Sequence, residues 1–307
     1  MILGKHYTMK NAPITVIITT YNDSEYLAAA INSVISQTLL PAQLIIVDDG
    51  SDDNNACKIT NKYLNNDSGI EVTYFKKKNG GASSARNLGL KHVSEEFVTF
   101  LDADDQMLSN NLLDKFNAIK DLNNDYFGVY GSNMTSKRVK DSFASIDGLA
   151  TTSQVGKAVE GIPGGSCSYL FKSETIKEIG GYDENLHNNE DNDLIIRLIK
   201  NNKKCKGIDS CGVLIFMRKN SLSRGGDVKK RFYNTMIFLD KAEDKSYFDK
   251  EELLFRKKTV YLVFIRSIIF KNPIEALYYA NVAFSYGKPI GSKQKAIHLL
   301  SKLKKSN

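Results

Sequence analysis

The segment ITVIITT, residues 14–20, is apolar and shows little alternation between apolar and polar positions. This pattern is typical of a strand that is buried on both faces of a parallel sheet. Further apolar runs follow at Leu44–Val47, Val72–Phe75 and Phe97–Leu101, and helical patterns separate them. Strands that alternate with helices predict an α/β fold, with a mostly parallel central sheet flanked by helices.

The rest of the first 130 residues extends this alternation. The pattern predicts helices over about 56–65, 83–92 and Leu112–Leu122, and a further strand near Tyr126–Tyr130. In sheets of this kind, ligands bind beyond the carboxyl ends of the strands. We therefore expect the functional site where the predicted strands end.

Carboxylates gather at two of these strand ends. Asp48-Asp49-Gly50-Ser51 follows the second strand, and Asp102-Ala103-Asp104-Asp105 follows the fourth. A single acidic pair is most often a solvated surface feature, but several carboxylates that converge repel one another unless a cation compensates them. Oxygen ligands suit hard ions, so the pattern favours Mg²⁺ or Mn²⁺ held together with a diphosphate.

The segment 79–87, NGGASSARN, leads into the predicted helix after the third strand. Its small residues would let a ligand approach the backbone, and a helix N-terminus favours anions. A plain glycine turn explains the same residues, and both interpretations stay open. Neither a GxGxxG turn nor a Walker lysine loop follows the first strand, which argues against a dinucleotide or P-loop site.

The composition is that of an ordinary globular protein. The 307 residues are 42% hydrophobic and 25% charged, with a net charge of +7. Residues 1–215 carry 22 basic and 27 acidic side chains, whereas residues 216–307 carry 20 and 8. A uniformly basic nucleic-acid-binding protein would not show this split, so we expect no nucleic-acid partner.

The sequence shows no pattern typical of a membrane span, a secretory leader or a metal-binding cysteine pair. No run reaches the roughly 18 apolar residues of a membrane span, and the N-terminal MILGKHYTMK lacks the apolar region of a secretory leader. The four cysteines have no CxxC spacing, which favours reduced thiols and argues against a zinc site. We expect a cytoplasmic protein, with attachment to the inner face of the plasma membrane as an open alternative.

Taken in order, the motifs resemble those of the family 2 glycosyltransferases, which have the GT-A fold. The motifs are Thr-Tyr-Asn after the first strand, VDDGS (47–51), NGGASSARN (79–87), FLDADD (100–105), GGYDE (180–184) and NEDNDLIIRLIKN (189–201). The resemblance covers roughly residues 12–220. It implies an enzyme that transfers a sugar from a nucleotide-sugar, by family habit a UDP-sugar, with inversion at the anomeric carbon. It also implies a divalent cation, Mn²⁺ or Mg²⁺.

The resemblance assigns roles to individual residues. Asp191 would be the general base, with Glu190 in support, and Asp104 would ligate the metal. Asp49 would read the base and Tyr21 would lie against it. The residues implied to bind the donor are Thr20, Tyr21, Asp48, Asp49, Asn79, Arg86, Asp102, Ala103, Arg218 and Lys219. The family often has a histidine in the segment that closes over the diphosphate, and this chain has none there, so the closing residue stays open.

Two other functions stay open on the sequence. A sugar-nucleotide nucleotidyltransferase would use similar metal chemistry, although it would be expected to carry a basic, glycine-rich loop after the first strand. A non-catalytic scaffold that binds nucleotide-sugars is the second alternative. The acidic residues of the motif at 189–201 could also only complement the positive end of a helix.

The chain is expected to contain two parts. Residues 1–220 form the catalytic domain, with a donor half at about 12–130 and an acceptor half at about 131–220. Residues 221–307 form a basic helical extension, which includes an amphipathic helix at 292–305. This extension could pack on the core, mediate homo-oligomerisation or bind an anionic membrane surface. The acceptor is expected to be a glycan, or a lipid-linked or protein-linked hydroxyl.

Overall fold

The computed structural model describes residues 11–64, 68–136, 146–157, 161–217, 227–289, 294–295 and 297–298. The chain divides into two compact units, Met1–Met217 and Arg218–Asn307. Most of the predicted amphipathic helix at 292–305 lies outside the described residues.

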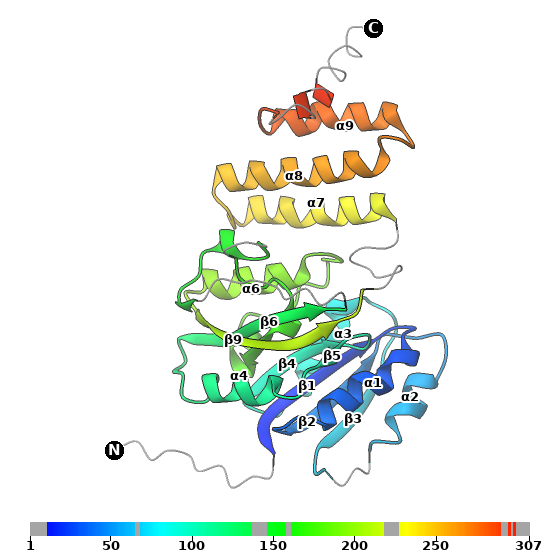
Figure 1. The fold of residues 1–307 in the computed structure, drawn as a ribbon, viewed down its shortest axis with the longest axis vertical. Coiled ribbons are helices and arrows are strands. Elements are labelled where there is room, and N and C mark those ends of the chain that lie inside the picture. The colour runs from blue at the N-terminus through cyan, green and yellow to red at the C-terminus, as the bar shows by residue number, and fades with distance from the viewer. Residues whose placement is uncertain are drawn as a thin grey trace. The chain divides into compact units, whose positions relative to one another are not determined.

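The first unit is built on one sheet with helices on its faces (Figure 1). In chain order its strands and helices are β1 (Ala12–Thr20), α1 (Ser24–Ile35), β2 (Pro41–Asp48), α2 (Asn55–Thr60), β3 (Glu71–Lys76), α3 (Ala82–Lys91), β4 (Phe97–Asp102), β5 (Gln106–Met107), α4 (Asn111–Ile119), β6 (Tyr126–Thr135), β7 (Asp147–Gly148), β8 (Tyr169–Lys172), α5 (Ser173–Glu178), α6 (Glu190–Lys200) and β9 (Lys204–Ile215). Two short 3-10 turns, η1 (Thr152–Gln154) and η2 (Ser166–Ser168), lie between β7 and β8.

The strand order is β3-β2-β1-β4-β8-β6-β9-β5, with β7 paired to β9. The four strands β3, β2, β1 and β4 are parallel to one another, which confirms the predicted α/β fold. Strand β8 is antiparallel to both β4 and β6, and β9 is parallel to β6. Strands β6 and β9 therefore run in the same direction as the first four.

The core explains why β1 reads as an apolar run. Ile14, Val16 and Ile18 face a cluster that includes buried residues of α1, α2 and α4. Ile17 points to the opposite face, where α3 packs so closely that a Cβ on Gly89 would lie 2.7 Å from its Cγ2. Both faces of β1 are therefore covered, and alternation with polar residues is lost.

Two helices end earlier than the sequence pattern predicts. Helix α2 ends at Thr60 instead of residue 65, and α4 ends at Ile119 instead of Leu122. After α2, the amides of Lys62 and Tyr63 bond to carbonyls three residues back, which tightens the last turn. The amide of Leu122 makes the same kind of bond to Ile119 after α4.

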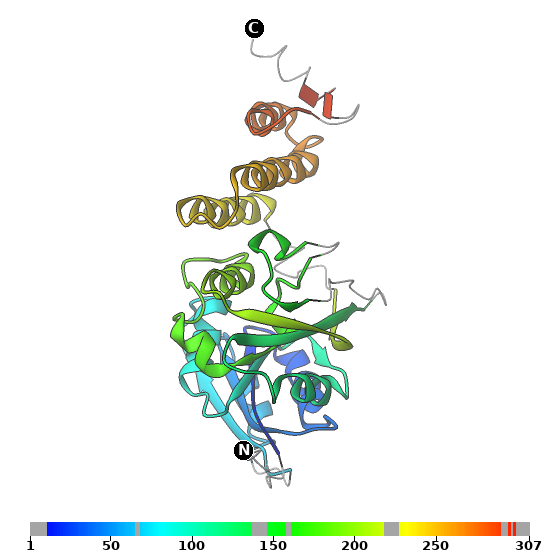
Figure 2. The same ribbon diagram turned by 90° about the vertical axis from the view of Figure 1, so that its left-hand side faces the viewer.

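The second unit contains α7 (Val228–Asp244), α8 (Lys250–Ile268) and α9 (Pro273–Ser285). Helix α8 lies between α7 and α9 in both views (Figures 1 and 2). Asn272 caps α9, and its side-chain oxygen accepts a hydrogen bond from the amide of Glu275 at 3.2 Å. Phe232 stacks on Phe264 with ring centroids 4.3 Å apart and anchors the apolar core of this unit.

Exposed apolar side chains lie on each of these helices. They include Tyr233 and Ile237 of α7, Phe255 and Val263 of α8, and Ile274 and Tyr278 of α9. Among the residues that the structure describes, no helix combines the length and the hydropathy that a membrane crossing requires.

The pairing of β6 with β8 depends on a glycine. Gly128 lies opposite Phe171, and a Cβ at residue 128 would lie 2.6 Å from the carbonyl oxygen of Leu170. The carbonyl oxygen of Leu170 and the Cα of Phe171, the two nearest atoms, belong to the backbone of β8 and cannot move aside like a side chain. The two strands would therefore have to separate. Gly128→Ala should therefore lower the free energy of unfolding by about 1–3 kcal/mol, measured as a lower urea midpoint.

Gly165→Ala is the matched control for this substitution. Residue 165 has an ordinary φ of −75°. A Cβ there would have only the sulfur of Cys167 near it, at 3.8 Å. Its urea midpoint should stay close to that of the wild type, and equal midpoints for all three proteins would contradict the account of the β6–β8 pairing.

Candidate functional site

The carboxyl ends of β1, β2 and β4 lie side by side. In the sheet register Thr20 pairs with Asp48, and Thr19 pairs with Asp102. The two acidic segments singled out in the sequence therefore flank the end of β1. Thr20 is buried, whereas the next side chain, Tyr21, is 46% exposed and is free to contact a ligand.

The acidic pair after β2 is buried and fully engaged with the protein. Asp48 accepts hydrogen bonds from the amide of Ser51 at 2.8 Å and from the hydroxyl of Tyr74 at 2.8 Å. Burial, followed by the hydrogen bond to Asp48, raises the pKa of Tyr74 far above its ordinary value. The hydroxyl of Tyr74 therefore stays protonated and remains a donor.

Asp49 organises the loop that precedes α3. Its carboxylate accepts hydrogen bonds from the amides of Gly80 at 3.0 Å and Gly81 at 2.7 Å, and pairs with the ammonium of Lys77 at 2.7 Å. Asp49 is 4% exposed. These bonds fix the start of α3, and the expected role of Asp49 in reading a nucleotide base stays a prediction.

Asn79 is exposed in the same loop, beside Gly50. Gly50 has a φ of +83°, and a Cβ there would lie 2.6 Å from the amide nitrogen of Asn79. The loops after β2 and β3 therefore pack backbone against backbone at this point. This contact explains why a glycine follows the acidic pair.

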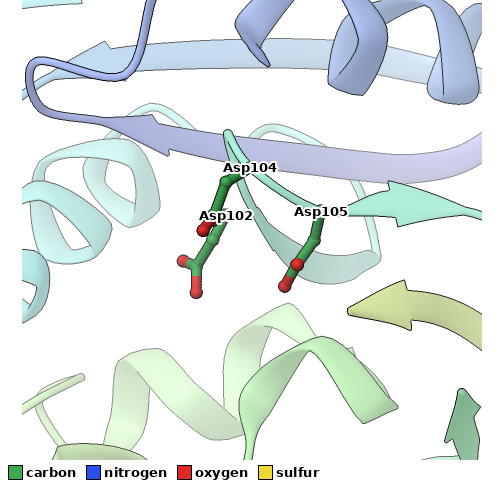
Figure 3. Close-up of side chains that lie close together, drawn as sticks. All are labelled: Asp102, Asp104 and Asp105. Atoms are coloured by element: carbon green, nitrogen blue, oxygen red, sulfur yellow. The ribbon is translucent and has the colours of Figure 1, made fainter. Parts of the chain in front are cut away.

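The acidic segment after β4 forms a cluster of three carboxylates. Asp102, Asp104 and Asp105 each offer an oxygen atom, and these atoms lie within 4.8 Å of one another. Figure 3 shows the three side chains directed to the same side of the loop. Ala103 is buried between them, and its amide donates to the carbonyl of Thr19 at 3.1 Å, which fixes the loop to β1.

This donor set fits a hard divalent cation. Three carboxylate oxygens at such separations repel one another, and oxygen ligands are those that Mg²⁺ and Mn²⁺ prefer. Asp105 is 6% exposed and also accepts a hydrogen bond from the amide of Phe216 at 2.9 Å, which ties the cluster to the end of β9. Asp102 and Asp104 are more accessible than Asp105.

Arg86 of α3 joins this cluster to the acidic start of α6. Its Nη2 lies 3.0 Å from Oδ1 of Asp102, and its Nη1 lies 3.2 Å from Oε1 of Glu190 and 3.4 Å from Oδ1 of Asp191. The guanidinium also lies over the ring of Tyr182, 5.4 Å from its centroid. Arg86 is therefore buried and in contact with all three of these carboxylates, and its expected role in donor binding stays a prediction.

The charges around Arg86 shift its pKa and that of Glu190. Burial opposes the charge of Arg86, but Asp191, Asp102 and Glu190 together raise the pKa of its guanidinium well above the ordinary value. Burial, and then the charge of Asp191, raise the pKa of Glu190, although Arg86 opposes this shift. One buried cation thus contacts three carboxylates, and its charge does not offset the effects of burial and Asp191 on Glu190.

Glu190 and Asp191 occupy the first turn of α6, next to Asn189, whose φ is +63°. Their side chains are 17% and 24% exposed, so a substrate can reach them. Asp193, in contrast, is fully buried and pairs with Nε of Arg197 at 2.7 Å. Asp193 therefore forms an ion pair within α6, whereas the carboxylates of Glu190 and Asp191 contact Arg86.

Three residues of this site were given no individual role by the sequence. Ser166 and Tyr182 form a hydrogen-bonded chain to Asp191, and Lys77 pairs with Asp49. Tyr182 stands in GGYDE and Ser166 in GIPGGSCSY, but nothing in either segment indicates a contact with α6. Arg218 and Lys219, expected to lie near the diphosphate, fall outside the described residues.

Comparison with known proteins identifies a family. Residues 15–174 match the model of "Glycosyl transferase family 2". The chain is 29% identical over 193 residues to an uncharacterized glycosyltransferase of Rickettsia bellii, covering 61% of this chain and 27% of that protein. It is 34% identical over 205 residues to the minor teichoic acid biosynthesis protein GgaB of Bacillus subtilis, covering 63% and 22%. The chain thus spans only about a quarter of the length of these relatives.

Solved structures share the fold. One is residues 1–349 of TarS from Staphylococcus aureus in complex with UDP-GlcNAc, with a TM-score of 0.65 and 18% identity over 89% of this chain and 81% of that one. Another is the mannosyltransferase PcManGT from Pyrobaculum calidifontis in complex with GDP-Man and Mn²⁺, with a TM-score of 0.57 and 15% identity over 98% and 90%.

The raised pKa of Glu190 predicts a pH-dependent effect on stability. A glutamate whose pKa is higher in the folded state contributes stability below its ordinary pKa, and loses that contribution as the pH rises through the raised value. Glu190→Gln removes the destabilising charge. Its melting temperature should therefore exceed that of the wild type at pH 7, and this gain should shrink towards pH 4.

Glu184→Gln provides a control of opposite sign. The hydrogen bond from Asn87 is the main cause that lowers the pKa of Glu184. Its stabilising contribution is present above the ordinary glutamate pKa and is lost as the pH falls through the lowered value. Glu184→Gln should therefore not stabilise the fold at pH 7. A melting temperature of Glu190→Gln below that of the wild type at pH 7 would contradict the assignment.

Proposed function

This chain belongs to glycosyl transferase family 2, and on that premise we propose that it is an inverting, divalent-metal-dependent glycosyltransferase. It transfers a sugar from a nucleotide-sugar, in the first instance a UDP-sugar, to a hydroxyl group of a glycan, lipid-linked or protein-linked acceptor. Asp191 acts as the general base and Asp104 as a metal ligand.

One observation carries this proposal. Two groups of carboxylates, one after β4 and one at the start of α6, meet at a single arginine, Arg86. A transferase that uses a nucleoside diphosphate needs a cation site and a base close together, because both act on bonds to the same anomeric carbon. The contacts of Arg86 with Asp102 and Asp191 support that closeness.

The chemistry assigned to Asp191 follows from inversion. The acceptor oxygen attacks the anomeric carbon as the bond from that carbon to the diphosphate oxygen breaks, and the diphosphate leaves with the electron pair. The carboxylate of Asp191 takes the proton of the acceptor hydroxyl. Asp191 lies in the first turn of α6 and its side chain is 24% exposed, so an acceptor hydroxyl can reach it.

The cation would be held by the cluster after β4. Asp104 is the ligand of first choice, with Asp102 and Asp105 within reach of the same ion. A bound divalent cation supplies Lewis-acid stabilisation of the leaving diphosphate. Arg86 holds Asp102 on the side of the cluster that faces α6.

A ligand bound to a protein of similar fold suggests the donor, and the name of a related protein suggests the acceptor. TarS was solved with UDP-GlcNAc, and GgaB is named for teichoic acid biosynthesis. We therefore take UDP-GlcNAc as the first donor to test and a hydroxyl-bearing surface polymer as the first acceptor. Release of UDP that depends on the acceptor would separate this function from nucleotidyl transfer and from non-catalytic binding.

The role of Asp191 predicts a separation of binding from turnover. Asp191→Asn keeps the size of the side chain and an acceptor oxygen but cannot take the proton at neutral pH. The kcat should fall roughly 10²- to 10⁴-fold, the usual contribution of a general base. The Kd for the nucleotide-sugar, measured by isothermal titration calorimetry, should stay within about twofold of the wild-type value, since no donor contact is removed.

Asp193→Asn is the matched control for this test. Asp193 stands two residues further along α6 and pairs with Arg197 of the same helix. Its loss should lower the melting temperature and leave kcat close to the wild-type value. Turnover of Asp191→Asn near the wild-type rate would rule out Asp191 as the base.

The metal role predicts a joint loss of ion dependence and donor binding. Asp104→Ala removes a ligand, so Mn²⁺ should no longer strengthen donor binding in calorimetry, and the affinity should fall roughly tenfold or more. Asp121→Ala, at an exposed position after α4, should bind like the wild type. Donor binding by Asp104→Ala that still depends on Mn²⁺ would refute the assignment.

A further inference from the structure

The carboxylate of Asp191 is held by a buried chain of two hydroxyl groups. The hydroxyl of Ser166, in the turn η2, donates to Oδ1 of Asp191 at 2.6 Å. The hydroxyl of Tyr182 donates to the oxygen of Ser166 at 2.7 Å. Ser166 is 1% exposed and Tyr182 is 3% exposed, so water does not compete with either bond.

The chemistry of the three groups allows only one direction for this chain. An ionised carboxylate can only accept, so the single proton of Ser166 is used on Asp191. The oxygen of Ser166 then accepts, and Tyr182 must donate. Burial and the charge of Asp191 raise the pKa of Tyr182 well above its ordinary value, so this hydroxyl keeps its proton.

Tyr182 itself is fixed on three sides. The side chain of Asn87 accepts from the amide of Tyr182 at 2.8 Å and donates to its carbonyl at 2.9 Å. The ring meets Phe100 edge to face, 5.3 Å between centroids, and Arg86 lies over it. The hydroxyl of Tyr182 is therefore presented to Ser166 from a rigid position.

The turn that carries Ser166 packs tightly on α6. A Cβ on Gly164 would overlap the side-chain oxygen of Asn192, the residue after Asp191. The loop before Ser166 is therefore in close contact with α6, next to the residue to which Ser166 donates.

Both hydrogen bonds that the described residues make to the carboxylate of Asp191 end on the same oxygen. Ser166 and Nη1 of Arg86 both reach Oδ1, at 2.6 and 3.4 Å. Oδ2 thus has no donor among these residues and is the oxygen that can take a proton. Two donors on Oδ1 also restrict the rotation of the carboxylate about its terminal bond.

We propose that Ser166 is a positioning residue that orients Asp191 for proton transfer, with Tyr182 fixing the hydroxyl of Ser166. This inference rests on the proposed function, in which Asp191 is the general base. Neither Ser166 nor Tyr182 needs to contact the donor sugar for this role. Their loss should therefore affect the rate of the reaction and not the binding of the nucleotide-sugar.

Three variants test the chain by steady-state kinetics and calorimetry. Ser166→Ala removes a hydrogen bond to a charged group, so kcat should fall roughly tenfold or more while the donor KM and Kd stay unchanged. Tyr182→Phe keeps the ring and should lower kcat roughly twofold to tenfold. Because Tyr182 acts through Ser166, the double variant should be no slower than Ser166→Ala alone.

Ser168→Ala is the matched control, because Ser168 lies in the same turn with the same 1% exposure but bonds to Asn133 at 2.6 Å. It should lower the melting temperature and leave kcat unchanged. If Ser166→Ala does not fold, Tyr182→Phe carries the test by the same separation of kcat from Kd.

Two results would overturn the inference: wild-type kcat in Ser166→Ala, or effects of the two substitutions that simply multiply in the double variant. If Asp191→Asn is inactive while Ser166→Ala is not, only the positioning role fails. If Asp191→Asn is active, both the positioning role of Ser166 and the proposed role of Asp191 as the general base fail.

Discussion

A single buried guanidinium holds the two acidic parts of the site together. Arg86 lies between Asp102, after β4, and the pair Glu190 and Asp191, at the start of α6, and contacts all three. Without this cation, three carboxylates would face one another at short range in a partly desolvated space. The arrangement of α3, β4 and α6 therefore depends on the position of this one side chain.

The four parallel strands β1–β4 and strand β6 could be predicted from the sequence, whereas β8 and β9 could not. Strands β1 and β4 are buried on both faces, so each reads as a continuous apolar run. Strand β8 has only four residues, Tyr169–Lys172, and is too short for a periodic signal. Strand β9, Lys204–Ile215, mixes buried and partly exposed positions without regular alternation, so no period indicated a strand.

The site shows the same division between local and distant signals. Asp102 was predicted from its place at a strand end, and Asp191 from the resemblance of the motif at 189–201 to the family. The contacts that connect them are not local, since Arg86 and Glu190 are separated by 104 positions and Ser166 and Asp191 by 25. Spacing along one sequence carries no signal for such pairs, and a hydroxyl–carboxylate bond needs only a serine at the right place in space.

The net charge of +7 is the sum of an acidic first part and a basic second part of the chain. The acidic first unit contains carboxylates that meet at Arg86, at Asp49 and in the cluster after β4. The basic second unit carries exposed aromatic and aliphatic side chains on α7, α8 and α9. Carboxylates of the candidate site thus make up part of the acidic share, and the basic excess lies in the second unit.

The most direct test of the account is the anomeric configuration of the product. The account places one base, Asp191, beside the cation site and requires a single displacement, which inverts the anomeric carbon. With a donor whose sugar is α-linked to the diphosphate, proton NMR of the purified product should show a β-linkage. An α-linked product would contradict the single displacement and the role of Asp191 with it.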